Sequence, residues 1–597
     1  MKKTVCGVML VLILISTLTL TFKIQPAKGE WTGTVYIRAD GSIDPQDAPL
    51  QKIGNIYTLV GNITSSADAI VIEKDNITLD GAGFALCGNR AYESSGVNLA
   101  RRTNVTIKNI LIDGFYYGIY LFISYNNTIS ENSIINNDYG IYLACSDYNS
   151  ISGNIFINSG LFVDYSFDNL VNNNLVNNKP LVYLEGISNF NVKDAGQVIL
   201  VECAHILVEG LDLSYTCVGV QLLKTNNSNI IGNSVMDDQY GIYLEYSFNN
   251  VISTNNILCA LSGVHLQASY YNNVLANNIK AKVKDYSMYG IALWGGSNYN
   301  TIQKNNITDC SSGIRIWFSS GNIISGNNAT ENFQGICIDS GSHENNIFGN
   351  DVLANYFGIY LWQCMNNTIH GNNVRKNHDG VLIGYSRENE FSHNNFIDNS
   401  QQVYVYSSDF NVWDDGYPSG GNFWSDYTGL DANGDALGDT HYTMDANNTD
   451  RYPLIAPFRT FDAGVWNGIS YNVDIVSNSS VSGFQFNVDQ KSICFNVTGD
   501  NGTVGFCRVT IPNDLLWVDD GWTITVGDQS ITDYTLISDE NFTYLYFTYN
   551  QSTQTVTIQG THILPEYPLI ALLILLLTMS TLTAIMNNKT RKTKDAS

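Results

Sequence analysis

Between about Gly96 and Asn395 the chain repeats one short phrase: a glycine, an apolar residue, any residue and a second apolar residue. Glycines of this phrase stand at positions 96, 118 and 140 and again at 219, 241 and 263, each step being 22 residues. From 263 to 380 the steps are 27, 23, 22, 23 and 22 residues. A nearly fixed period of this length predicts a solenoid.

The interior of each repeat predicts which solenoid it is. An Asn follows each glycine by about nine residues, and a second Asn comes five places later, as at Asn127 and Asn132. Apolar residues alternate with a period of two, which is typical of half-buried strands, and no helical period is present. Each repeat is therefore expected to hold two or three short strands joined by Asn and Gly corners, since both residues tolerate left-handed backbone. Stacked at ~4.8 Å, identical Asn amides can hydrogen-bond from coil to coil. The pattern predicts a parallel β-helix.

The Asn-Asn-x-Ile and Gly-Ile-x-Leu phrases resemble the NosD-like right-handed β-helix proteins, a carbohydrate-binding and sugar-hydrolase superfamily. A second stretch, Trp-Asp-Asp-Gly-Tyr-Pro-Ser-Gly-Gly-Asn-Phe-Trp-Ser-Asp-Tyr at 413–427, is similar, together with 431–439 and 450–454, to the segment that closes such helices in archaeal envelope proteins. The resemblance covers most of 31–460. It implies the fold more than the function, because one fold hosts many activities.

These patterns divide an all-β chain into seven parts. Residues 1–29, with Lys2, Lys3 and an apolar run, predict a secretory signal. The β-helix with its N-terminal cap is expected over 30–410, and a Trp-, Gly- and Asp-rich closing segment over 411–460. Clean alternation over 461–561 predicts a small Ig-like β-sandwich that serves as a stalk. A linker with a sorting-like Pro-Glu-Tyr-Pro (562–568), a transmembrane helix (569–586) and a basic cytoplasmic tail (587–597) complete the division. The chain is thus expected to be secreted and anchored at the outer face of the cytoplasmic membrane or at the cell surface.

Two features of the stalk depend on this location. Cys494 and Cys507 flank an expected hairpin at 500–502, and they could form a disulfide if their strands pair. Sequons within the stalk suit a glycoprotein; they begin at Asn478, Asn496, Asn501, Asn541 and Asn550.

The charge of the chain restricts its partners. Lys and Arg total 30 against 55 Asp and Glu, a net charge of −25. Nucleic acid and anionic membrane surfaces need clustered cations, so both are disfavoured as partners. The acidity fits an extracellular protein, although solubility alone would also account for it.

One face of the solenoid is expected to bind glycans. If the first and third residues after each glycine point inward, the second and fourth point outward, and the outward set is rich in aromatic rings. A polysaccharide or cell-envelope glycan could lie along the axis and stack on successive rings. The alternative is that stacked rings only stabilise neighbouring strands. The expected glycan-binding residues are Tyr120, Tyr142, Tyr243, Trp294, Arg315, Trp317, Tyr360 and Trp362.

Catalysis has weaker support in the sequence, and no catalytic residue is assigned. Glycoside hydrolysis needs two carboxylates at a defined separation. Asp237 and Asp238 are the only adjacent acidic pair within the repeats, and a solvated turn is the expected reading of them. A non-catalytic glycan-binding protein is therefore preferred, with a polysaccharide lyase or glycoside hydrolase as the alternative.

The sequence also contains candidate ligands for two metals, copper and calcium. The resemblance implies an accessory role in copper-enzyme maturation as a further alternative, with His343, His370 and His393 as candidates; the positions of His370 and His393 in their repeats predict opposite orientations. A structural calcium ion is expected at Asp431, Asn433, Asp435 and Asp439, which match the first, third, fifth and ninth places of an EF-hand loop. The loop departs from that pattern at Ala436 and Tyr442, and an Asp-rich turn without metal is the alternative.

Overall fold

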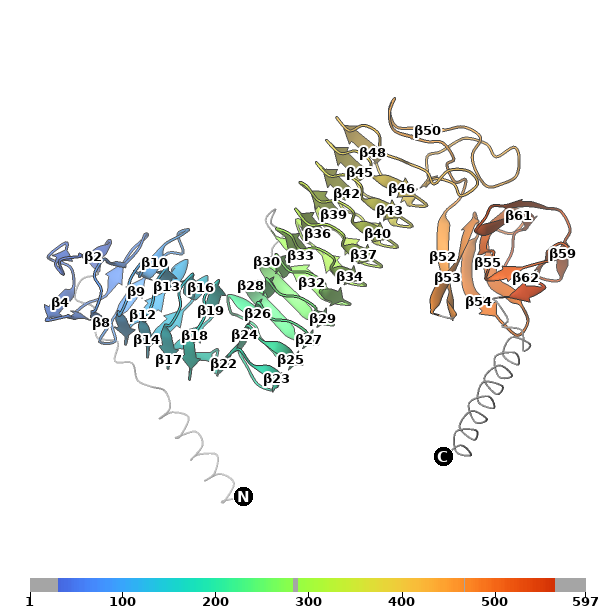
Figure 1. Cartoon of the computed structure of the whole chain (residues 1–597). Coiled ribbons are helices and arrows are strands. Elements are labelled where there is room, and N and C mark those ends of the chain that lie inside the picture. The colour runs from blue at the N-terminus through green and yellow to red at the C-terminus, as the bar shows by residue number, and fades with distance from the viewer. Residues whose placement is uncertain (1–30, 283–287, 467, 564–597) are drawn as a thin grey trace, which may run out of the picture. The chain divides into compact units, whose positions relative to one another are not determined.

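The computed structural model describes residues 31–282, 288–466 and 468–563, and every regular element in them is a strand, from β1 (Trp31–Thr32) to β63 (His562–Ile563) (Figure 1). The expected signal, membrane helix and basic tail lie outside the described residues, as does most of the 562–568 linker. Within those described ranges, no helix is long and apolar enough to cross a membrane. The chain forms two compact units, Met1–Asn345 and Asn346–Ser597.

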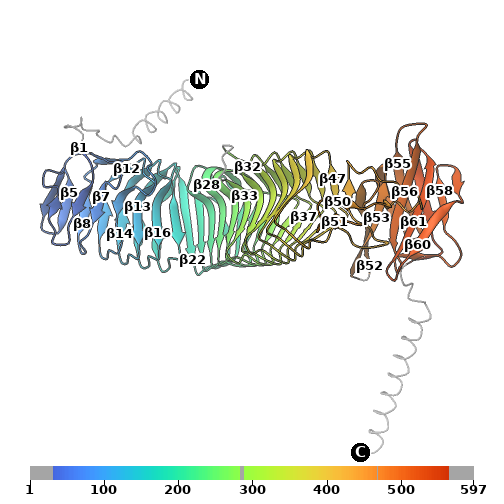
Figure 2. The same ribbon diagram turned by 90° about the horizontal axis from the view of Figure 1, so that it is seen from above.

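The first unit is a parallel β-solenoid, as the sequence predicts. Strand β13 (Tyr117–Phe122) pairs in parallel with β16 (Tyr139–Ala144), with Ile119 opposite Ile141 and Leu121 opposite Leu143. These four side chains are fully buried, so equivalent residues of successive coils stack into one continuous core. Figure 2 shows β13, β16, β28 and β33 following one another along the solenoid.

The glycines of the repeating phrase lie within strands, whereas other glycines form part of the expected corners, such as Gly153 (φ 67°) and Gly232 (φ 64°). Gly118 lies in β13, where a Cβ atom would stand 2.4 Å from the carbonyl oxygen of Gly140 in the next coil. Glycine is needed there because two coils approach closely, not because the backbone is left-handed. The left-handed corners that follow these strands are formed by other residues, such as Ile123 (φ 51°) and Cys145 (φ 47°).

The Asn residues form the expected ladders through the corners. Asn132 Nδ2 donates to Asn154 Oδ1 at 3.0 Å and to the carbonyl oxygen of Ile107 in the preceding coil at 3.1 Å. The backbone N–H of Asn132 donates to the same Asn154 oxygen at 3.1 Å. Each buried amide thus joins three coils, and it satisfies backbone groups that a corner would otherwise leave unpaired.

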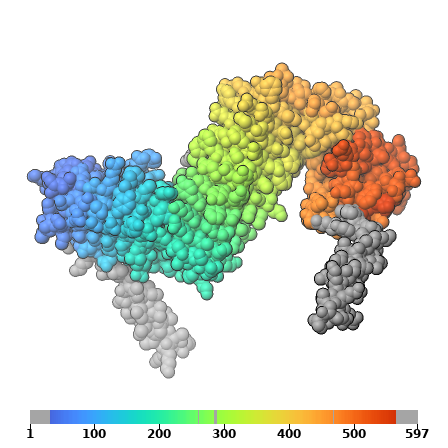
Figure 3. All heavy atoms as spheres, in the orientation of Figure 1, coloured from blue at the N-terminus to red at the C-terminus, as the bar shows by residue number. Residues whose placement is uncertain are grey.

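The solenoid of the first unit changes course at an elbow. Strand β19 (Leu161–Asp164) ends its sheet, and side-chain amides replace the next strand. Gln197 bonds both the N–H and the carbonyl of Leu161 (3.0 and 2.7 Å), and Gln221 of β26 (Val218–Leu223) bonds both groups of Val163 (3.1 and 2.5 Å). The surface of this unit is hollowed between its blue and its green atoms (Figure 3).

The second unit begins with the coils from β40 (Asn346–Phe348) to β48 (Gln401–Tyr406). The Trp-rich segment then closes the coils: Trp413 stacks on Phe391 with ring centroids 4.2 Å apart, and Trp424 stacks on Phe396 at 4.4 Å. Both indoles are fully buried. The segment therefore covers the last apolar layer of the core, which a solenoid requires.

A β-sandwich follows, made of two antiparallel five-stranded sheets rather than the four and three strands of a constant-type immunoglobulin domain. In spatial order, one sheet contains β52 (Phe458–Trp466), β53 (Ile469–Ser477), β56 (Val504–Pro512), β61 (Phe542–Asn550) and β60 (Tyr534–Ser538). The other contains β54 (Ser480–Asn487), β55 (Ser492–Thr498), β62 (Gln554–Gln559), β58 (Thr523–Val526) and β59 (Gln529–Ile531).

The prediction that Cys494 and Cys507 flank a hairpin was wrong. Cys494 lies in β55 and Cys507 in β56, which belong to opposite sheets, and both thiols are free. The turn at 500–502 therefore crosses between the sheets, and the condition for the disulfide is not met.

Candidate functional site

A row of seven aromatic rings, here called the ring ladder, follows one face of the first unit. It crosses β13, β16, β19, β28 (Ser234–Glu245), β30 (Asn256–Gln267), β33 (Tyr289–Trp294) and β36 (Ser312–Trp317). Its members are Tyr120, Tyr142, Phe162, Tyr243, His265, Trp294 and Trp317, with successive centroid distances of 6.0, 5.4, 5.4, 5.1, 5.7 and 4.6 Å. Five of the expected glycan-binding residues are therefore brought together.

Two members of the ladder were not among those expected residues. Phe162 stands in Gly160-Leu161-Phe162-Val163, which carries the repeating phrase and could have been found by it. His265 occupies an outward position of its strand, but an imidazole is not an obvious stacking ring. Phe162 also connects the ladder across the elbow, because it contacts both Tyr139 at 5.4 Å and Tyr240 at 6.0 Å.

Polar atoms along the same face lack hydrogen-bond partners. Four successive strands of the ladder, from β28 to β36, each contribute at least one such buried atom among the described residues. A buried polar group without a partner costs about 1–3 kcal/mol, and each exception in a native structure calls for an explanation. Among the described residues, the unpartnered atoms on these strands include Glu245 Oε2, His265 Nδ1, Trp294 Nε1 and Arg315 Nε.

Two carboxyl groups interact across the elbow. Burial, together with the nearby charge of Asp164, raises the pKa of Glu245 to about 7. Burial also raises the pKa of Asp164, whose Oδ2 accepts a hydrogen bond from Tyr142 Oη at 3.0 Å. Near neutral pH this pair can therefore hold one proton and one negative charge, the division of roles that acid–base chemistry needs.

The far end of the ladder carries a fixed cation and a neutral imidazole. Arg315 donates to Asp339 Oδ2 at 2.8 Å and to Tyr289 Oη at 3.0 Å, and its guanidinium lies 6.0 Å from the ring centre of Trp294. Burial lowers the pKa of His265 to about 4, so this imidazole is neutral at neutral pH. This end of the face thus offers rings, an Arg–Asp ion pair and a neutral imidazole in fixed positions.

Asp237 and Asp238 do not form a solvated turn. Asp238 is buried within β28, where its Oδ1 accepts the backbone N–H of Thr216 at 2.6 Å, and burial raises its pKa well above the usual range. Asp237 adopts φ 64° and pairs with Lys282 at 2.9 Å. The left-handed residue interrupts the strand alternation and turns the following side chain inward, which the sequence did not reveal.

The remaining expected rings, Tyr360 and Trp362, belong to β42 (Phe357–Trp362) in the second unit. Their rings stack on each other at 6.0 Å, and Trp362 also stacks on Tyr406 at 6.0 Å. They form a separate group of rings within the second unit.

The acidic loop of the second unit is held by its own backbone. Asp431 accepts the N–H groups of Gly434, Asp435 and Ala436 at 2.8, 3.1 and 2.8 Å. Asp439 Oδ2 accepts the N–H of Ala432 at 2.7 Å, and Asn433 Nδ2 donates to Asp435 Oδ2 at 3.0 Å. In the part of the chain that the structure describes, no three His, Cys, Asp or Glu side chains gather as a metal site would require. Calcium at this loop remains a prediction.

Two of the three histidines considered for copper, His370 and His393, lie in the second unit. His370 and His393 line the same cavity of the second unit, so the expectation that they face opposite ways was wrong; the left-handed backbone of His393 (φ 56°) redirects its side chain. Their rings stack on Phe348 and Phe458 at 5.1 and 4.5 Å. They are not part of any three-ligand group within residues 31–282, 288–466 and 468–563.

Comparisons with known proteins agree with this fold. The sequence model of a family described as "Periplasmic copper-binding protein (NosD)" matches residues 51–197, 186–289 and 280–429. A probable ABC transporter binding protein NosD from Stutzerimonas stutzeri is 42% identical over 73 residues, which is 12% of this chain and 16% of that protein.

Solved β-helix structures match more distantly. A variant of the periplasmic alginate epimerase AlgG is 13% identical over 63% of this chain and 83% of its own, with a TM-score of 0.28. DFA-IIIase from Arthrobacter chlorophenolicus A6, in complex with GF2, is 12% identical over 48% of this chain and 69% of its own, with a TM-score of 0.23. Identities and TM-scores this low carry no inference about activity.

Proposed function

The chain belongs to the NosD family, and from that premise we propose that the ring ladder of its first unit binds glycans. A polysaccharide would lie along the solenoid axis, because the rings follow one another at the spacing of the coils. The description of the family as periplasmic supports a location outside the cytoplasm. Anchoring through 569–586 remains a prediction.

The observation that carries this proposal is the coincidence of stacked rings with unpartnered polar atoms. Ring stacking alone would be explained by strand stability. Stability does not explain why Glu245, His265, Trp294 and Arg315 each bury a polar atom that has no partner among the described residues. Natural proteins accept such costs where a binding function needs them. Glycan hydroxyl groups both donate and accept hydrogen bonds, and each of the four side chains would turn its buried atom toward the ligand to use them.

Removal of the two indoles should weaken glycan binding without unfolding the coils. In the full chain with Trp294→Ala and Trp317→Ala, we expect affinity for the glycans bound by the wild type to fall at least about tenfold, because buried aromatic anchors dominate interface energies. Glycan-array binding followed by titration calorimetry measures the change.

A matched control removes an equal number of rings elsewhere on the same unit. Tyr271 and Tyr299 stack on each other at 5.3 Å and are exposed, outside the ladder. A variant with both changed to Ala should bind as the wild type does. Equal loss in both double variants, or none in the Trp294/Trp317 variant, would show that the ladder only supports the fold.

The stability of the folded protein is expected to depend on pH through Glu245. Because burial raises its pKa from 4.5 to about 7, the folded state binds more protons than the unfolded state between these values. The stability of the wild type should therefore decrease as pH rises toward 8, and Glu245→Gln should be more stable there by about 2 kcal/mol. At pH 4 the two proteins should be equally stable. Urea unfolding at both pH values measures this, and a stabilisation independent of pH would contradict the assigned cause.

Hydrolysis of the bound glycan is a second candidate function, favoured by the Asp164–Glu245 pair. Protonated Glu245 could donate to the leaving oxygen while ionised Asp164 activates water or stabilises positive charge. Release of reducing ends from array-positive glycans tests this. Glu245→Gln and Asp164→Asn should each lose turnover while retaining binding. Wild-type protein that binds a glycan without cleaving it would leave binding as the function.

We also expect calcium to stabilise the loop at 431–439. Differential scanning calorimetry should show a higher melting temperature in calcium than in chelator, by mass action on the folded state, and Asp435→Asn should remove the difference. The alternative is a turn held by its own hydrogen bonds beside the buried Arg508, whose charge interacts with Asp431 and Asp435. No calcium effect on the wild type would establish that alternative.

A further inference from the structure

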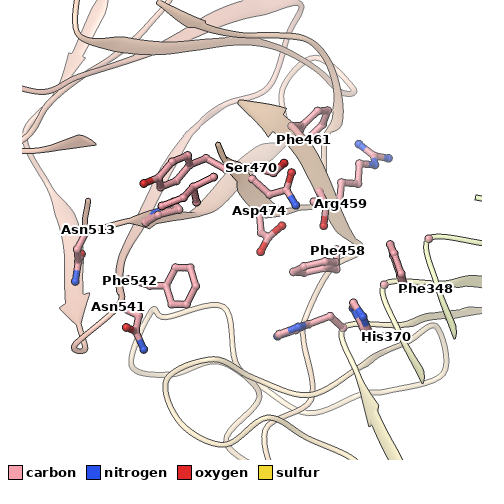
Figure 4. A pocket seen from close by; sticks show the side chains of 18 of the residues that line it. Phe348, His370, Phe458, Arg459, Phe461, Ser470, Asp474, Asn513, Asn541 and Phe542 are labelled. Carbon is pink, nitrogen blue, oxygen red and sulfur yellow. The ribbon is translucent and has the colours of Figure 1, made fainter. Parts of the chain in front are cut away.

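The second unit contains a cavity of ≈ 1220 Å³ that neither the ladder nor the acidic loop accounts for (Figure 4). One wall consists of corners and strand ends of the last coils, at Phe348, His370 and His393. The other wall is the start of β52 and its neighbours β53, β56 and β61 in the sandwich. The cavity thus lies between the solenoid coils and the sandwich within this unit.

Aromatic rings and neutral imidazoles line the coil side. His370 stacks on Phe348 at 5.1 Å and 12°, and His393 stacks on Phe458 at 4.5 Å and 9°. Burial lowers the pKa of both histidines, that of His393 to about 4. At neutral pH this wall therefore presents π faces without positive charge. Phe461 and Phe542 add two further rings on the sandwich side.

A carboxyl group points into this aromatic cavity. Asp474 projects from β53 into the hollow, between Phe458 and Phe542 in Figure 4. Its Oδ1 is buried without a hydrogen-bond partner among the described residues. Burial raises the pKa of Asp474 to about 6, and a hydrogen bond from the side chain of Thr460 to the carboxyl group opposes this shift only in part. Arg508 on β56 only partly compensates this charge, since its guanidinium donates to the carbonyl oxygens of Ser419 and Pro418.

The other charged lining residues make the cavity acidic. Asp514, which accepts a hydrogen bond from Tyr471 Oη at 3.0 Å, and Glu540 lie in its lining together with Asp474. Arg459 is the one Lys or Arg among the described lining residues, and it donates to the carbonyl oxygen of Ser479 at 3.3 Å. Three carboxylates against one guanidinium give a formal charge of −2 at neutral pH.

We propose that this cavity binds an organic cation, a primary or quaternary ammonium group enclosed by the rings and paired with Asp474. Aromatic faces attract such cations, and most strongly where water is excluded. An ammonium also supplies the countercharge that a half-buried carboxylate lacks. A neutral sugar would stack on the rings but leave that charge uncompensated, and an anion would be repelled.

Choline and 3,3-dimethyl-1-butanol are a suitable pair of probes, because they have nearly the same shape and differ by one positive charge. Titration calorimetry or ligand-observed NMR on the full chain should show choline binding at least roughly tenfold tighter than the neutral isostere, which is about 1.4 kcal/mol. Equal binding of both, or binding of neither, would overturn the proposal.

Variants and pH then test the part played by Asp474. Asp474→Asn should weaken choline binding at least about tenfold, while Asp528→Asn, an exposed change in the turn between β58 and β59, should leave it unaltered. Choline affinity should also fall between pH 7.5 and 5 as Asp474 is protonated. Melting temperatures report folding of each variant. Undiminished binding by a folded Asp474→Asn protein, or affinity independent of pH, would contradict the pairing.

Discussion

Gly290→Ala is expected to destabilise the first unit by about 3 kcal/mol or more, and to prevent accumulation of folded protein at growth temperature. The new Cβ atom would stand 2.4 Å from the carbonyl oxygen of Gly313 and 2.3 Å from Ile307 Cγ2. Strand β33 cannot move away, because it is paired with β30 on one side and β36 on the other. Circular dichroism and urea unfolding of the purified protein measure the loss.

Gly296 provides the control that separates crowding from backbone strain. It adopts φ +89° and has open space where a Cβ atom would stand. Gly296→Ala should therefore cost only the left-handed strain of about 1–2 kcal/mol. If Gly296→Ala were the more harmful change, conformational freedom rather than close approach would explain the glycine of the repeating phrase.

Asn305→Leu is expected to cost about 4 kcal/mol, since several buried groups would lose their partners at about 1–3 kcal/mol each. Asn305 Oδ1 accepts both the backbone N–H and the side-chain Nδ2 of Asn277, at 2.9 and 3.0 Å. Its own Nδ2 donates to the carbonyl oxygen of Val274 and to Asn327 Oδ1, both at 2.9 Å. Leucine has a similar size but can make none of these bonds.

The adjacent residue, Asn306, allows the same substitution to be made at a solvent-exposed position. Asn306 belongs to an exposed ladder, accepting from Asn328 at 3.0 Å and donating to Asn278 at 2.9 Å. Water can replace these bonds, so Asn306→Leu should change the unfolding free energy by no more than about 0.5 kcal/mol. Similar losses at both positions, measured by urea unfolding, would mean that burial is not what makes the inner ladder important.

The sequence was sufficient for features that recur at the coil spacing. Inward residues such as Ile119 and Ile141, and ladder residues such as Asn132 and Asn154, meet their own equivalents 22 positions along the chain. The repeat period therefore predicts which residues contact each other in successive coils. The same logic identified the aromatic face, because an outward ring in one coil lies beside the outward ring of the next. It did not give the reason for the glycines of the repeating phrase, since composition does not distinguish a tight corner, as at Gly153, from a close approach between strands, as at Gly118.

What the repeat could not specify depends on contacts between dissimilar residues at irregular separations. Gln221 completes the edge of β19 at a separation of 58 residues, and Phe162 reaches Tyr243 across the same elbow. Asp164 and Glu245 influence each other only because the coils turn there. The cavity around Asp474 likewise needs both the coils and the sandwich. The sequence by itself thus determined the solenoid, its amide ladders and its ring-bearing face, because these depend on short-range pairing repeated in register. The tertiary structure decided which carboxyl groups are buried and what they meet, because burial depends on how non-equivalent segments pack.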